Sequence, residues 1–243
     1  MSQPVLVTGC SSGIGLAIAT HLAAHGVPVF ATVRRDADAE RLAAIDGVEP
    51  LICDVTDDAP VARPRAAIDA RGGGLWGIVH NAGIAHLGHL TTTSLDDLRA
   101  VFEVNVFGVH RVTNALADLI VASRGRIVTI SSISGTLSPV ALGAYSMSKH
   151  ALEAYTDSLA KQLAPLGVHV SAVAAACRAA LFDEAPLERY LVVPNADEAD
   201  VTLEQAAHEW TRLNASTPHR WSSERLAAEV DARDGSPAPR EGR

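Results

Sequence analysis

A tyrosine and a lysine stand four residues apart in the run Tyr145-Ser146-Met147-Ser148-Lys149. This spacing brings two side chains to the same face of a helix, so the Lys149 ammonium can lie beside the Tyr145 phenol. A free tyrosine phenol has a pKa of about 10, and a neighbouring cation stabilises its ionised form. The pair can therefore move a proton to or from a substrate oxygen near neutral pH. Taken alone, a Tyr-x-x-x-Lys spacing also occurs by chance on many helices.

A second chemical pattern is the glycine-rich run of residues 8–15, Thr-Gly-Cys-Ser-Ser-Gly-Ile-Gly, between an expected strand and an expected helix. Glycines allow a tight turn and let backbone N–H groups approach a phosphate at the positive end of the helix. The spacing is G-x-x-x-G-x-G, not the G-x-G-x-x-G of the standard dinucleotide fingerprint. Its position favours a pyrophosphate site over a plain turn. The candidate contacts are Gly9, Ser11, Ser12, Gly13, Ile14 and Gly15.

Two arginines follow the second expected strand, where a site that prefers the unphosphorylated dinucleotide usually carries Asp or Glu. Arginine can donate two hydrogen bonds to the 2′-phosphate of NADP, so we predict that Arg34 favours NADP(H) over NAD(H). The alternative is that Arg34 and Arg35 only solvate a loop. Asp54 and Val55 follow the third expected strand and are candidate cofactor contacts. Asp54 could accept a hydrogen bond from the adenine amino group, or it could cap the next helix.

The elements that must position these groups alternate from residue 4 onward, with no internal repeat. Short apolar runs followed by longer helical patterns predict βαβ units, hence a Rossmann-type, doubly wound α/β fold with a mainly parallel, seven-stranded sheet in three layers. Strands are expected at residues 5–8, 27–33, 49–53, 75–80, 125–131, 168–173 and 189–193. Helices are expected at residues 13–25, 36–44, 57–71, 95–122, 141–163, 177–184, 202–213 and 223–232. Residues 1–233 should form a single dinucleotide-binding domain, followed by a disordered tail at 234–243.

Composition limits the core and the partners. Of the 243 residues, 48% are hydrophobic but only 4% are aromatic, which suits a buried parallel sheet of Val, Ile, Leu and Ala with helices packed on it. The formal net charge of -8 and the lack of a Lys/Arg-rich stretch argue against a nucleic-acid partner. No uncharged apolar run approaches about 18 residues, and no basic leader precedes the first strand. We therefore expect a cytoplasmic protein without a membrane span.

Cysteine and histidine side chains invite a disulfide or metal interpretation that their spacing does not support. The cysteines are an odd number and widely separated, which fits neither a disulfide framework nor a zinc site; they are Cys10, Cys53 and Cys177. His80, His86 and His89 lack the helical spacing or the cysteine partners of a metal site, so we interpret them as loop histidines. We predict a reducing compartment and no metal site.

Over about residues 4–173 the chain resembles the classical short-chain dehydrogenases/reductases. Five segments carry the resemblance in the family's order: residues 8–15, Asn81-Ala82-Gly83, Asn105, Ser131-Ser132 and residues 145–149. Residues 10–16 and 165–173 look most like the hydroxysteroid and retinol dehydrogenase branch. The resemblance implies an oxidoreductase that acts on CH–OH groups with an NAD(P) cofactor.

The resemblance also assigns roles to particular residues. Tyr145 would be the catalytic acid/base, and Lys149 would also hydrogen-bond the nicotinamide ribose. Ser132, which stands 13 residues before Tyr145, would orient the substrate oxygen. Asn105, in the middle of a helix, would relay water behind Lys149, and Asn81-Ala82-Gly83 would line the adenosine side of the crevice. Alternatively, Ser132 could simply end a strand and Asn105 could cap a kink in the helix. The joint spacing of the five segments disfavours these interpretations.

The chain departs from the family pattern after the sixth expected strand. There the family has a Pro-Gly turn that touches the nicotinamide, followed by a segment that covers the substrate, whereas residues 173–184 read Val-Ala-Ala-Ala-Cys-Arg-Ala-Ala-Leu-Phe-Asp-Glu. An apparent deletion after residue 173 would remove a wall of the substrate pocket, admit water and weaken electrostatic catalysis. We expect either a weakened enzyme or a site completed from outside this chain, such as by a partner subunit.

The preferred function is the NADP(H)-dependent interconversion of a small apolar secondary or allylic alcohol and its ketone or aldehyde. The alternative is a catalytically weak or silent dinucleotide-binding protein of the same fold. A nucleotide-sugar epimerase is disfavoured by the glycine spacing and by the short chain after the sheet, and a methyltransferase would not need the tyrosine, lysine and serine together. The helices at residues 95–122 and 141–163 resemble the family's dimer-forming pair, so we expect a homodimer or homotetramer.

Overall fold

The structure, a computed structural model, describes residues 3–57, 62–173, 181, 182, 184, 189 and 190. The chain divides into two compact units, residues 1–196 and residues 197–243, and the second unit lies outside the described residues. The helices expected at 202–213 and 223–232 and the tail at 234–243 therefore lie outside them as well. So does most of the helix expected at 177–184, of which residues 181 and 182 are helical. The expected single domain of residues 1–233 stays a prediction.

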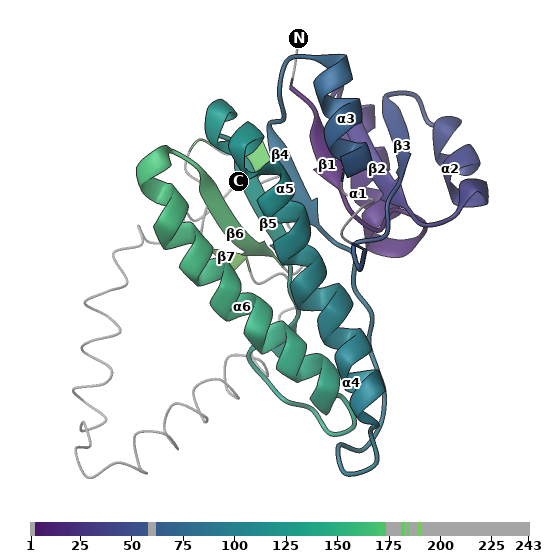
Figure 1. The fold of residues 1–243 in the computed structure, drawn as a ribbon, viewed down its shortest axis with the longest axis vertical. Coiled ribbons are helices and arrows are strands. Elements are labelled where there is room, and N and C mark those ends of the chain that lie inside the picture. The colour runs from purple at the N-terminus through teal and green to yellow at the C-terminus, as the bar shows by residue number, and fades with distance from the viewer. Residues whose placement is uncertain (1–2, 58–61, 174–180, 183, 185–188, 191–243) are drawn as a thin grey trace, which may run out of the picture. The chain divides into compact units, whose positions relative to one another are not determined.

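A seven-stranded sheet lies at the centre of the first unit, in the order β3-β2-β1-β4-β5-β6-β7 (Figure 1). Its strands are β1 (Val5–Val7), β2 (Val29–Val33), β3 (Val48–Ile52), β4 (Gly77–His80), β5 (Arg126–Ile130), β6 (His169–Val173) and β7 (Arg189–Tyr190). Every strand pair is parallel, and Val5 aligns with Val29 on one side and with Gly77 on the other. The strand order reverses between β1 and β4, which is where open sheets of this type bind ligands. The predicted doubly wound fold is confirmed.

Helices cover both faces of the sheet. They are α1 (Gly13–Ala24), α2 (Asp36–Ala43), α3 (Ala62–Arg71), α4 (Leu95–Phe102), η1 (Glu103–Phe107), α5 (Gly108–Ser123), η2 (Ile133–Gly135), α6 (Gly143–Leu163) and η3 (Ala164–Leu166). The predicted long helix at 95–122 is present, but η1, a π-helical turn, interrupts it. The α6 helix runs alongside this α4–η1–α5 segment (Figure 1). None of the described helices is both long and apolar enough to cross a bilayer.

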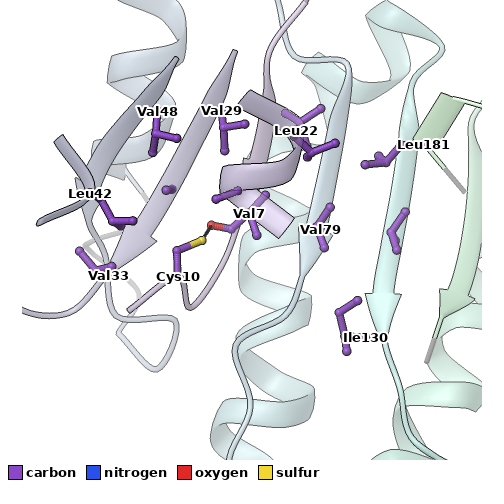
Figure 2. Close-up of a cluster of buried hydrophobic side chains, with 14 of the residues drawn as sticks. Val7, Cys10, Leu22, Val29, Val33, Leu42, Val48, Val79, Ile130 and Leu181 are labelled. Carbon is purple, nitrogen blue, oxygen red and sulfur yellow. Dashed lines mark hydrogen bonds between the residues drawn. The ribbon is translucent and has the colours of Figure 1, made fainter. Parts of the chain in front are cut away.

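The alternation of side chains along the strands separates two hydrophobic clusters. Val5 and Val7 of β1 point to one face of the sheet, where Leu22 of α1 and Leu42 of α2 pack. Figure 2 shows this cluster, in which the thiol of Cys10 also points inward. On the opposite face, Leu6 meets side chains of α3 and α5, which are Ile68, Val112, Leu116 and Ile120. Each large apolar side chain buried in this way contributes about 1.5–3 kcal/mol.

Leu181, which follows β6 in the sequence, packs against the sheet. The Leu181 side chain is fully buried in the first cluster (Figure 2). Its backbone oxygen accepts a hydrogen bond of 3.1 Å from Nε1 of Trp76. A Cβ built on Gly77 would lie 2.8 Å from Cδ2 of Leu181, so a larger residue at this position would require the leucine side chain to move.

Candidate active site

A cavity of about 500 Å³ opens at the carboxyl ends of the strands around β1 and β4. Most of the predicted site residues line it, namely Gly9, Ser11, Ser12, Ile14, Arg34, Asp54, Val55, Asn81, Ala82, Gly83, Tyr145 and Lys149. The remaining predicted residues, Gly13, Gly15, Asn105 and Ser132, are not among its lining. The topology thus brings together segments that lie far apart in the sequence.

The glycine loop at one end of the cavity is closely packed. The backbone φ of Gly9 is +72°, and a Cβ there would lie 2.8 Å from Cα of Ala82. A Cβ on Gly15 would overlap the side-chain amide of Asn81 and the carbonyl of Gly9. Gly15 is therefore needed for packing of the loop rather than for lining the cavity.

The N-terminus of α1 directly follows this loop. Ser12 is its N-cap residue but makes no side-chain capping hydrogen bond, and the first turn carries no acidic residue. The first N–H groups of a helix lack partners within the helix and attract an anion. The loop and the helix end therefore fit a phosphate group.

Asn81 connects this loop to β4. Its Nδ2 donates hydrogen bonds to the backbone oxygens of Thr8, at 2.9 Å, and Gly9, at 3.1 Å. In return, Oγ1 of Thr8 accepts from the backbone N–H groups of Asn81 and Ala82, each at 3.0 Å. Asn81 thus both lines the cavity and holds the glycine loop in place, the second of which the sequence analysis did not anticipate.

Arg34, at the end of β2, is exposed and lines the cavity, as a group meeting a 2′-phosphate should. Asp54 at the end of β3 also lines it. Its Oδ1 accepts from the backbone N–H of Thr56 at 3.0 Å and from Oγ1 of Thr56 at 2.8 Å. Residues 55–57 are not helical, so the alternative that Asp54 caps the next helix is wrong. Its contact with adenine stays a prediction.

The tyrosine and lysine pair lies at the other end of the cavity, on α6. The Lys149 side chain is buried, and its Nζ lies 5.6 Å from the centroid of the Tyr145 ring. The same Nζ donates a hydrogen bond of 2.6 Å to the backbone oxygen of Ile130, at the end of β5. Burial lowers the pKa of Lys149 from 10.5 to about 8, and the charge of Glu153 opposes that shift. A cation near neutral pH is thereby held beside a phenol.

Asn105 lies in η1 and is almost fully buried. Its Oδ1 accepts from the backbone N–H of Ile84, and its Nδ2 donates to the oxygen of Ile84 and to Oγ of Ser148, each at 2.9 Å. Oγ of Ser148 in turn donates to the backbone oxygen of Tyr145 at 2.7 Å. These bonds explain why an asparagine is tolerated inside a helix. Its side chain connects the loop after β4 with α6, while a water relay at Asn105 stays a prediction.

The two serines after β5 have different surroundings. Oγ of Ser132 accepts from the backbone N–H of Ser134 at 3.1 Å and so caps η2. A hydroxyl that accepts one bond can still donate its own proton to a substrate oxygen. Ser131 lines the cavity, and its buried Oγ has no hydrogen-bond partner among the described residues.

Sequence reasoning missed several residues of the cavity wall. They are Thr32, Val33, Cys53, Ile84, Ala85, Val104 and Ile130, and Ser131 was quoted without a role. Most of them lie at the end of a strand or in the segment that follows it, whereas Val104 lies in η1. The two described cysteines are chemically quiet, because burial raises the pKa of Cys10 to about 12 and that of Cys53 to about 11. Cys177 lies outside the described residues.

The prediction that His80 is a loop histidine is wrong. It is the last residue of β4, paired with Thr129 of β5, and only 3% of it is exposed. Its Nε2 lies 2.9 Å from Oγ1 of Thr113, and burial lowers the pKa of His80 to about 3. The strand continues through His80 because its imidazole finds a hydroxyl partner inside the core. His86 and His89 lie in the following loop, as predicted.

The loop after β4 carries exposed apolar side chains, of which Ile84 lines the cavity. Ile84, Leu87 and Leu90 of the loop after β4 are exposed. This loop meets the segment before α6 through a hydrogen bond of 2.9 Å from the N–H of Gly88 to the oxygen of Ala141. Val140 in that segment is 91% exposed. The predicted loss of the substrate-covering segment falls directly after residue 173. Residues 174–180 lie outside the described residues, so this loss stays a prediction.

The sequence of this chain is similar to those of known dehydrogenases. A family model described as short chain dehydrogenase matches residues 3–184. The chain is 37% identical over 182 residues to a mitochondrial D-beta-hydroxybutyrate dehydrogenase of Bos taurus, and 37% identical over 174 residues to retinol dehydrogenase 16 of Rattus norvegicus. The matches cover 71% and 70% of this chain but 53% and 55% of the relatives, so the chain spans about half the length of each. Both agree with the resemblance predicted from the sequence.

A solved structure adds a ligand to this comparison. It is the 3-ketoacyl-(acyl-carrier-protein) reductase of Brucella melitensis complexed with NADH, which shares 27% sequence identity and a TM-score of 0.68 with this chain. The likeness covers 70% of this chain and 74% of that one.

Proposed function

The chain belongs to the short-chain dehydrogenase family, and from this premise we propose that it is an NADP(H)-dependent oxidoreductase. It interconverts a small apolar secondary or allylic alcohol and the corresponding ketone or aldehyde. The observation that carries the proposal is the buried ammonium of Lys149 beside the Tyr145 ring, at the end of a cavity that begins at an uncapped helix N-terminus.

Tyr145 exchanges the proton with the substrate oxygen. An ammonium next to the phenol stabilises its ionised form, so Tyr145 can accept a proton from an alcohol and return it to a carbonyl. Lys149 is held for this purpose by its bond to Ile130. The hydroxyl of Ser132 donates to the substrate oxygen as negative charge develops there. The nicotinamide, when bound, supplies or accepts the hydride.

The chain's residues fit the cofactor. The loop of residues 9–15 and the N-terminus of α1 would hold the pyrophosphate, and Arg34 would meet the 2′-phosphate that distinguishes NADP from NAD. Asp54 and Val55 would bound the adenosine end. The Brucella reductase carries NADH, so the preference for NADP rests on Arg34 alone.

The exposed apolar side chains of the loop after β4, of which Ile84 lines the cavity, support an apolar substrate. Contact with the loop after β4 would remove water from Ile84, Leu87 and Leu90, and burial of apolar surface contributes about 25 cal/mol per Å². A charged substrate would gain nothing from these side chains.

Exposed apolar side chains on α4 and η1 support the expected assembly of two or four copies. Leu95 of α4 and Phe107 of η1 are more than half and about half exposed, respectively. Burying them against a second copy would remove apolar surface from water, which supports the expected homodimer or homotetramer. The cytoplasmic location expected from the sequence stays a prediction, and the bovine relative is mitochondrial by name.

Replacing the phenol tests the mechanism. Tyr145→Phe should reduce NADPH-dependent reduction of a panel of apolar ketones and aldehydes by about 10²-fold or more, because positioned proton transfer is typically worth about 10²- to 10⁴-fold. NADPH binding, measured by fluorescence titration, should remain close to that of the unchanged protein. Undiminished turnover by the variant would show that Tyr145 is not the acid/base.

One observation favours the alternative of a silent dinucleotide-binding protein. Ser132 is not among the residues that line the cavity, and its hydroxyl oxygen already accepts a bond from Ser134. If the unchanged protein binds NADPH but turns over no carbonyl compound in the panel, the alternative is correct and the proposed activity is wrong.

A further inference from the structure

A buried carboxylate lies on α2, next to the cofactor end of the cavity. Asp38 is only 4% exposed. Its Oδ2 accepts a hydrogen bond of 2.8 Å from Nε of Arg35, and its Oδ1 accepts one of 3.0 Å from Nη2 of Arg41. The bond from Arg35 holds the pKa of Asp38 below its ordinary value, so the carboxylate stays ionised. An ionised carboxylate that is removed from water needs cationic partners, which makes this arrangement well defined.

Arg41 reaches beyond this pair to the glycine loop. The same Nη2 that donates to Asp38 lies 2.6 Å from the backbone oxygen of Ser11. A terminal guanidinium nitrogen carries two N–H bonds, so it can serve both acceptors at once. Asp38 and Ser11 are thereby connected through one nitrogen atom, although they lie in different elements.

Ser11 lies in the middle of the glycine loop, between two residues with positive φ. It lies between Gly9 and Gly13, whose φ values are +72° and +58°, and it lines the cavity. Strand β2 holds the start of the loop through Thr32, which accepts from the N–H groups of Gly9 and Cys10. Arg41 reaches the middle of the loop, where N–H groups must be positioned for a phosphate.

We propose that Arg41, oriented by Asp38, is a positioning residue that holds the phosphate loop in its binding conformation. This inference rests on the proposed dinucleotide-binding function and adds a residue that has no direct role in it. The guanidinium of Arg41 is engaged by a carboxylate and a backbone oxygen, and Arg41 is not among the cavity-lining residues, whereas Arg34 is. The two arginines therefore have separable roles.

The separation has a measurable consequence. The pyrophosphate is common to NADH and NADPH, so a less ordered loop raises the dissociation constants of both by the same factor. The 2′-phosphate is present only in NADPH, so loss of the residue that binds it weakens the binding of NADPH alone. The ratio of the two dissociation constants therefore distinguishes a positioning residue from a residue that binds the 2′-phosphate. A general loss of structure is detected separately, by the unfolding temperature.

The experiment measures the dissociation constants of NADPH and NADH for the full chain by fluorescence titration. Arg41→Gln should weaken both dinucleotides by about tenfold, since a hydrogen bond with a charged partner is typically worth about that much or more. Asp38→Asn should weaken both in the same way, because Arg41 then loses its anionic partner. Arg34→Gln should weaken NADPH alone. Arg41→Lys should recover part of the affinity, since a lysine can still donate to the oxygen of Ser11.

A matched control is available on α4, where Arg99 pairs with Asp96 at 3.2 Å with the same spacing of three residues. Arg99→Gln should leave both dissociation constants unchanged. The ligand-free unfolding temperature of Arg41→Gln, measured beside that of Arg99→Gln, should stay well above the temperature of the titrations, so that weaker binding is not the result of unfolding. Weakening of NADPH alone by Arg41→Gln, or no weakening of either dinucleotide, would overturn the inference. If the unchanged protein binds neither dinucleotide, the proposed function itself fails, and the inference fails with it.

Discussion

At the scale of one residue, burial of the Lys149 ammonium lowers the stability of the fold. An ammonium is less stable in the protein interior than in water, and burial accordingly lowers its pKa from 10.5 to about 8. One bond to Ile130 compensates for only part of the lost hydration. The burial of Lys149 therefore lowers the stability of the fold and is consistent with its proposed role beside Tyr145.

This shift predicts a pH dependence of stability. Between pH 8 and 10.5 the folded chain has released the Lys149 proton while the unfolded chain still binds it, so the contribution of Lys149 to stability rises with pH in this window. Below pH 8 both states bind the proton, and the full cost of the buried charge is present. Lys149→Met lacks this titration. Its free energy of unfolding relative to the unchanged protein should fall by up to about 1.4 kcal/mol per pH unit across the window.

Urea unfolding of both proteins from pH 7.5 to pH 10 measures the difference. A difference between the two proteins that stays constant over this range would contradict the burial of a charged Lys149.

At the scale of elements, the segment α4–η1–α5 adapts a helix to the site. A π-turn places one residue more in a turn than an α-helix does, and such turns often occur at functional sites. Here the turn directs Asn105 toward Ile84 on one side and Ser148 on the other. The loop after β4 and α6, which carries Tyr145 and Lys149, are thus connected through a third element.

Removing this connection should be costly. Asn105→Ala would leave the backbone N–H and oxygen of Ile84 and the hydroxyl of Ser148 without their partner, which should lower the free energy of unfolding by about 2–4 kcal/mol. Asn114→Ala is the control, since Asn114 is exposed on α5 and its amide contacts only His110 in the described structure. The two variants are compared by urea unfolding, and an equal, small effect of both would contradict the connecting role.

At the scale of the molecule, the cavity is assembled from both halves of the sheet. Residues of the glycine loop come from the first βα unit, and Tyr145 and Lys149 come from α6, on the other side of the point where the strand order reverses. A ligand that spans the cavity binds the folded chain and not the unfolded one, so it must stabilise the whole unit.

Dinucleotide binding should therefore raise the unfolding temperature. At a concentration of NADPH about 100 times its dissociation constant, the gain is about 2.7 kcal/mol, which corresponds to a shift of about 5–10 °C for a chain of this size. At that same fixed concentration, Arg34→Gln should show a smaller shift with NADPH and an unchanged shift with NADH. Differential scanning fluorimetry is the measurement, and the absence of any shift with either dinucleotide would contradict the cofactor site.

The order of elements and the approach of Tyr145 to Lys149 follow from the sequence alone. Short apolar runs bounded by turn residues favour buried strands, and their alternation with helical patterns favours a parallel sheet. Four residues on a helix bring two side chains together by backbone geometry, whatever surrounds them. The glycine loop was found for the same reason, since its strand, turn and helix are neighbours in the chain.

Tertiary structure alone decided the partners of individual side chains. His80 is buried because Thr113 meets it from another element, and Asn105 holds Ile84 only because a π-turn and the loop after β4 lie together. Arg41 reaches Ser11 across 30 positions of sequence. Such contacts depend on the register of the sheet and on how helices pack on it, and the spacing of residues along a chain carries no information about either.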